Sequence, residues 1–155
     1  MTEGNSEPKL DLEAVLRRLN EAHQVLIDAL QSLDPGQFEK EGDGGSIKRS
    51  LERTVDDLNF YYGMLTARCL GLPMPPCLGR SDFSSLREAT MAVQVAHRRY
   101  TNLLHDLVPE DLEKTATDDQ QVTYTLRQLI EMTAAHYTLR TRQVRALGEG
   151  ASTTG

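Results

Sequence analysis

Tryptophan is absent from this chain of 155 residues, and aromatic residues make up only 5% of it. Cysteine is also scarce: Cys69 and Cys77 lie in or beside a proline-rich stretch, a pattern unlike the disulfide framework of small secreted proteins. The first residues are polar and acidic, and they do not resemble a secretory leader. We therefore expect a reduced, cytoplasmic protein.

Long apolar runs and a surplus of basic residues are missing as well. No apolar run approaches the about 18 residues of a membrane span, so we expect no membrane partner. The 17 basic and 23 acidic residues give a net charge of −6, which argues against a nucleic acid held through its phosphates. The chain has no P-loop, no CxxC pair and no nucleophile elbow. The sequence therefore assigns no catalytic residue and no cofactor.

Helical periodicity is the main pattern that is present. β-Branched residues do not cluster in alternation, so no strand is expected. Apolar residues instead recur at intervals of three and four in four segments. Asp11 and Ser46 are suited to cap the first two segments, and Ser85 and Thr125 open capping boxes at the last two. The four segments are 11–33, 46–70, 85–107 and 125–147.

Four amphipathic helices in a chain of this length are typical of a four-helix bundle, so we predict the all-α class. The connections at 70–82 and 108–124 are long, and we expect both to be crossovers. The two ends of the chain are polar and contain glycine. We therefore predict a disordered N-terminus at 1–10, the bundle at 11–147 and a flexible tail at 148–155.

The last predicted helix carries a polar row on its inward half. Arg140 stands in that row, and a buried guanidinium must meet a carboxylate, an anion or water because it does not lose its proton. Asp57, four residues after Arg53 on the second helix, is the best internal partner. The row consists of Leu129, Thr133, His136, Arg140, Gln143 and Leu147.

Short motifs on two helices resemble those of the DinB/YfiT-like superfamily, over about Leu12 to Leu147. The motifs are Ser46-Ile47 at the start of the second helix, Thr125-Leu126-Arg127 at the start of the last, and Gln143-Val144 near its end. The resemblance implies a DinB-like bundle. In many members of that family, three histidines at fixed positions in these helices bind a divalent metal.

Two of the three family ligand positions have changed in this chain. Arg53 and Arg140 stand where histidines are expected, and His136 alone is retained. Arginine offers no lone pair to a metal, and two arginines repel a dication, so we expect no tightly bound transition metal. The family's metal-dependent transfer of small thiols is therefore not carried over. The resemblance also implies a homodimer, and the apolar Phe60, Tyr61 and Met64 are consistent with that.

Three hypotheses about function remain open, and whether the chain is an enzyme is undecided. In the first, the bundle is non-catalytic, and His136 and Arg140 pair with Asp57. In the second, a small anionic molecule binds beside His136. The residues of that ligand site are His136, Arg140, Arg53, Asp57 and Gln143. In the third, a metal-dependent transferase or hydrolase-like enzyme has a rebuilt site made of His23, His97 and His136, although His23 and His97 fit a structural role better.

Overall fold

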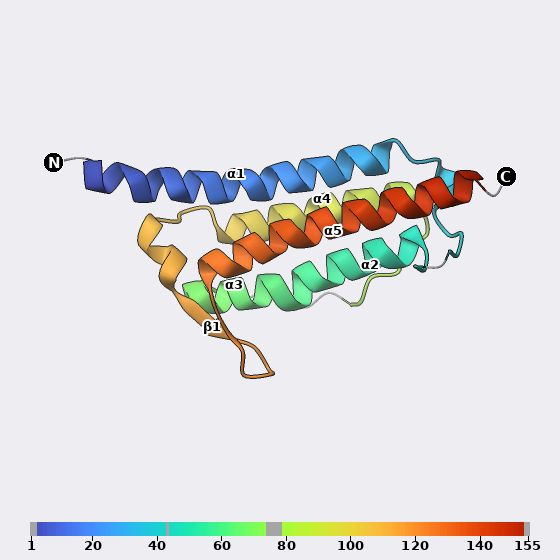
Figure 1. The fold of residues 1–155 in the computed structure, drawn as a ribbon. Helices are drawn as coiled ribbons and strands as arrows, with labels where there is room; N and C mark the ends of the chain where they lie inside the picture. Colours follow the sequence, from blue (N-terminus) through green and yellow to red (C-terminus); the bar gives the residue numbers. More distant parts are fainter. Residues whose placement is uncertain (1–2, 43, 74–78, 154–155) are drawn as a thin grey trace.

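The structure is a computed structural model that describes residues 3–42, 44–73 and 79–153. Its described part is mostly helical and forms a bundle of four long helical segments, so the all-α prediction is confirmed in broad terms (Figure 1). One segment is continuous from α2 through the π-helical turn η2 to α3. The segments are α1 (Glu3–Gln31), α2 (Ile47–Asp57) with η2 (Leu58–Tyr62) and α3 (Gly63–Leu70), α4 (Leu86–Leu103), and α5 (Leu126–Thr153).

Contacts between side chains fix the direction of each helix. α1 and α5 run parallel, because Asp11 pairs with Arg127 near their first residues and Gln37 donates to the Gly148 carbonyl near their last. α2 runs antiparallel to α5, since Ser50 contacts Gln143 while residues further along α2 contact earlier positions of α5. α4 runs in the same direction as α2. The directions are therefore up, down, down, up (Figure 1).

This arrangement corrects the prediction of two crossovers. The connection between α3 and α4 returns along the length of the bundle and is a crossover. The connection between α4 and α5 is not, because it joins two antiparallel helices at the same end. It contains the short helix η3 (Pro109–Glu113) and the strands β1 (Thr115–Thr117) and β2 (Thr123–Thr125).

The two strands form an antiparallel hairpin, so the expectation of no strand is wrong at this point. Ala116 is paired with Tyr124 in the middle of the ladder. Asp118 closes the turn by accepting hydrogen bonds from the backbone of Gln120 and Val122. The Tyr61 hydroxyl donates to Asp118 at 3.0 Å and ties the hairpin to η2. Strands of three residues are too short to show a period of two in the sequence.

The predicted helix starts are confirmed at three positions. Ser46 Oγ and Ser85 Oγ each accept a hydrogen bond from the backbone amide three residues later. Thr125 and Gln128 form the reciprocal bonds of a capping box. These side chains satisfy amide groups that have no partner inside the helix.

The first and last helices of the chain extend beyond their predicted boundaries. α1 begins at Glu3 rather than at Asp11, and Asp11 instead pairs with Arg127 across the bundle. α5 continues past Gly148 to Thr153. A Cβ on Gly148 would lie 2.8 Å from Leu33 Cδ2, so this glycine permits close contact rather than ending the helix.

The apolar faces of the four helical segments meet in one core, as the sequence indicates. Each helical segment contributes side chains with almost no exposed surface, and their burial is the main favourable contribution to folding. Among the described residues, no helix has both the length and the apolar character needed to span a bilayer. Representative core residues are Leu19, Leu26, Leu30, Leu51, Leu58, Leu65, Val93, Tyr100, Leu126, Ile130, Tyr137 and Val144.

A π-helical turn follows Asp57 directly. The Gly63 amide donates to the carbonyl of Leu58, five residues earlier. A Cβ on Gly63 would lie 2.6 Å from that oxygen, which is too close for any side chain without a backbone shift. A π-helical turn adds one residue to the helical repeat. It therefore sets how the side chains before Gly63 face the rest of the bundle relative to those after it.

We predict that Gly63→Ala lowers the free energy of unfolding by about 1–3 kcal/mol, because the new methyl group collides with the Leu58 carbonyl. The higher helix propensity of alanine acts in the opposite direction but is smaller, at about 1 kcal/mol. Urea denaturation measures the change. Gly44→Ala is the control, because nothing lies within 4 Å of a Cβ there. Unchanged or increased stability of Gly63→Ala would contradict the steric argument.

Candidate functional site

Four of the five predicted ligand-site residues lie together between α2 and α5. Asp57 Oδ2 is 3.5 Å from Arg140 Nη2 and 3.7 Å from His136 Nε2. Arg140 Nη1 donates to Gln143 Oε1 at 2.9 Å. The spacing of three and four residues places the three α5 side chains on one face of the helix. We call Asp57, His136, Arg140 and Gln143 the Asp57 cluster.

The fifth predicted residue, Arg53, lies one helical turn before Asp57 and is exposed. Its positive charge still acts on the cluster. Burial lowers the pKa of Arg140, Asp57 opposes that change, and the charge of Arg53 adds to the lowering. Arg53 therefore belongs to the electrostatic surroundings of the cluster.

Burial differs sharply between the two sides of the cluster. The side chains of His136 and Arg140 are 6% and 11% exposed, whereas that of Asp57 is 46% exposed. His136 Nε2 and Arg140 Nε are both buried without a hydrogen-bond partner. Leaving a buried polar group unbonded costs about 1–3 kcal/mol. The nitrogen side of the cluster is thus buried and incompletely bonded, and the carboxylate side is open to solvent.

The protonation states place the positive charge of the cluster on its buried side. Burial, helped by the charge of Arg140, lowers the pKa of His136 to about 4, so this ring is neutral at pH 7. Burial raises the pKa of Asp57, but Arg140 and Arg53 oppose that rise and favour the carboxylate. Asp56 also acts on Asp57 and raises its pKa, so two guanidinium groups face two carboxylates in these surroundings. The buried side of the cluster nevertheless carries only the positive charge of Arg140, because Asp57 lies on the exposed side.

Two further side chains at the site were not identified from the sequence. Ser50 Oγ donates to Gln143 Oε1 at 3.3 Å. The Tyr62 ring, in the π-helical turn, lies 5.4 Å from the His136 ring between centroids. No spacing signal in the sequence reveals the π-helical turn that carries Tyr62, and Gly63 is the one residue that points to this turn.

His23 and His97 lie together, but His136 does not join them. The rings of His23 and His97 stack with centroids 3.7 Å apart and planes 4° apart. His97 Nε2 lies 2.9 Å from Asn20 Oδ1, and His97 Nδ1 lies 2.8 Å from the Tyr137 hydroxyl. Because an amide oxygen only accepts, Nε2 donates and the tyrosine hydroxyl donates to Nδ1.

These positions contradict the geometry of the third hypothesis, in which three histidines converge. His136 belongs to the Asp57 cluster, while His23 and His97 stack on each other and both nitrogen atoms of His97 bond to other side chains. Within the described ranges, no group of three or more histidine, cysteine, aspartate or glutamate side chains is placed to hold a metal. Cys77 lies outside the described residues.

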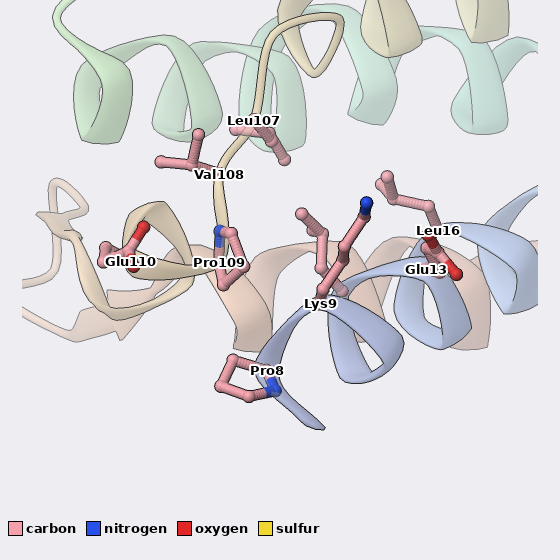
Figure 2. Close-up of a pocket in the computed structure, with 9 residues that line it drawn as sticks. Pro8, Lys9, Glu13, Leu16, Leu107, Val108, Pro109 and Glu110 are labelled. Carbon is pink, nitrogen blue, oxygen red and sulfur yellow. The ribbon is translucent and has the colours of Figure 1, made fainter. Parts of the chain in front are cut away.

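A separate cavity of about 530 Å³ lies where the first turns of α1 meet residues 107–110 (Figure 2). Figure 2 shows Lys9, Glu13 and Leu16 on the α1 side, opposite Leu107 and Val108. None of the residues that line this cavity belongs to the Asp57 cluster. The cavity therefore does not supply the predicted pocket near His136.

We predict that folding stability falls as the pH drops from about 6.5 towards 4, the interval between the unfolded and folded pKa values of these histidines. Burial lowers the pKa of His23 and His136 to about 4 and that of His97 to about 3. The unfolded chain consequently binds more protons in that interval. Each histidine contributes at most about 1.4 kcal/mol per pH unit, and His23 contributes less because it is only half-buried.

Urea denaturation at pH 7, 6 and 5 measures the slope of the free energy of unfolding against pH. His97→Gln should make it shallower, because one buried site of differential protonation is removed. His105→Gln is the matched control, since the His105 side chain is 83% exposed, and it should leave the slope unchanged. An identical slope in wild type and His97→Gln would contradict the assignment of His97 as a buried neutral ring.

Comparison with known proteins identifies no relative of this chain. No family model, no curated protein and no solved structure matches the chain.

Proposed function

We propose that this chain is a non-catalytic, cytoplasmic bundle of the DinB-like type that binds a small anionic molecule at the Asp57 cluster. One observation carries the proposal: two buried nitrogen atoms without partners, Arg140 Nε and His136 Nε2, lie on the buried side of the cluster, beside the positive charge of Arg140. The motifs quoted above support the DinB-like assignment.

The chemistry of the two nitrogen atoms favours an anion over other ligands. Arg140 Nε donates and never accepts. Neutral His136 donates from Nε2 in one of its two tautomers. A ligand oxygen with negative charge accepts from both atoms and pairs with the positive charge of Arg140. Hydrogen bonds of this charge-assisted kind are roughly twice as strong as neutral ones.

The competing hypothesis, a closed internal network, does not account for the unbonded nitrogen atoms of the cluster. Asp57 attracts Arg140 and His136, but its contacts of 3.5 and 3.7 Å exceed the roughly 2.7–3.2 Å of an N–H···O bond. The two buried nitrogen atoms keep their bonding capacity unused. An internal network that leaves two members unsatisfied is a poor structural element. It is a suitable starting point for a binding site.

A homodimer is part of the proposal, although the apolar residues that support it differ from those named from the sequence. Phe60 and Tyr61 have partners within the chain, because Arg80 lies 5.6 Å from the Phe60 ring and Tyr61 bonds to Asp118. Exposed apolar side chains instead occur one turn apart on α4, at Met91 and Val95. That face of α4 is the best candidate for contact between two copies.

We predict that Arg140→Met abolishes anion binding and changes the free energy of unfolding by less than about 1 kcal/mol. The stranded Asp57 is half-exposed and becomes solvated, and a buried guanidinium with an unsatisfied nitrogen is removed. Isothermal titration calorimetry with sodium formate and sodium phosphate at low ionic strength measures binding. Urea denaturation measures stability.

Arg142→Met is the matched control, because Arg142 is exposed on the same helix. It should retain binding. A loss of about 3–5 kcal/mol on Arg140→Met would show that the ion pair is a closed internal contact and would contradict the proposal. Equal anion binding by Arg140→Met and wild type would also contradict it.

A further inference from the structure

We propose that Asp57 is a built-in competitor of the ligand, and that the group it competes with is a carboxylate carrying one negative charge. This inference rests on the function proposed above and specifies its ligand and its regulation. It starts from the place that the Asp57 carboxylate occupies. A single oxygen, Oδ2, lies 3.5 Å from Arg140 Nη2 and 3.7 Å from His136 Nε2, so it stands beside the two side chains that a bound anion would contact.

Asp57 is placed to leave this position at small cost. Its side chain is 46% exposed, so solvent reaches the carboxylate on the outer side. Neither contact with the cluster is short enough to be a strong hydrogen bond. Desolvation disfavours the charged form of Asp57 where it lies now, and that penalty disappears when the carboxylate turns outward.

A second partner is available for the displaced carboxylate. Arg53 precedes Asp57 by four residues on α2, and side chains with this spacing are neighbours on a helix surface. Arg53 is exposed and lies on the solvent side of the cluster. When Asp57 turns from Arg140 to Arg53, its carboxylate keeps a positively charged partner. The buried nitrogen atoms of Arg140 and His136 then become accessible to the ligand. α2 therefore carries both the competitor and its alternative partner.

Charge favours a ligand with one negative charge. A bound monocarboxylate replaces the single charge of Asp57 beside Arg140, while Asp57 turns towards Arg53. A phosphate dianion brings a second negative charge to the same half-buried place, which is costly away from water. The shape argument agrees, because the group displaced is itself a carboxylate. A guanidinium matches the two oxygens of a carboxylate in one plane.

The test compares formate binding by wild type, Asp57→Asn and Asp57→Ala in isothermal titration calorimetry, with sodium formate and sodium phosphate as probes. Both variants remove the competitor, and both should bind formate about tenfold more tightly than wild type. Wild type should prefer formate to phosphate, and the preference should shrink in the variants because their cluster has one more positive charge.

Asp56→Asn is the control, since it removes the same charge one residue away without vacating the position of Asp57. It should change formate affinity by less than about threefold, because Asp56 bonds to the Ser81 amide rather than to the cluster and its charge acts there only at a distance. A gain as large as that of Asp57→Asn would show a general charge effect and overturn the proposal.

The remaining outcomes separate this inference from the proposed function. If wild type binds formate and both Asp57 variants bind it more weakly, Asp57 holds the ligand instead of competing with it. The anion-binding function then stands and the competitor model fails. If neither wild type nor the Asp57 variants bind formate or phosphate, both proposals fail. Circular dichroism of each variant establishes that the loss or gain is measured on folded protein.

Discussion

Arg140 carries a charge that burial does not remove, and the arrangement between α2 and α5 depends on it. Its side chain is only 11% exposed. A guanidinium keeps its proton in a protein, so the chain must supply compensating groups. Asp57 supplies opposite charge across the helix interface, and Gln143 supplies one hydrogen bond. Compensation is nevertheless incomplete, because Arg140 Nε has no partner. That deficit is what makes the site suited to an anion.

The bundle positions this cluster through contacts elsewhere. The Asp11–Arg127 pair fixes how α1 lies along α5, and the crossover is tied to α2 where Lys48 binds the Phe83 carbonyl at 2.8 Å. On another side of α5, Tyr137 bonds to His97, so neighbouring residues of one helix serve two separate polar sites. The π-helical turn after Asp57 brings the Tyr62 ring against His136. The site therefore depends on several helices and on one local irregularity.

Features encoded within a single helix were predictable, and features that depend on how helices rotate against each other were not. The apolar faces of the helices and the caps at Ser46 and Thr125 follow from local spacing. The pairing of Asp57 with Arg140 also followed, because an inward guanidinium needs an acid on the facing helix. The stacking of His23 on His97 depends on the relative rotation of α1 and α4, which no single periodicity contains. The π-helical turn and the three-residue strands are too short to be recognised from a periodic pattern.

The central claim is that an anion takes the place of Asp57 beside Arg140 and His136. A crystal structure determined in sodium formate, compared with one grown without it, tests that claim most directly. The account predicts density for formate within hydrogen-bond distance of Arg140 Nε and His136 Nε2, with the Asp57 carboxylate turned towards solvent. Density for Asp57 unchanged at 3.5 Å from Arg140 and 3.7 Å from His136, with no formate between them, would contradict it.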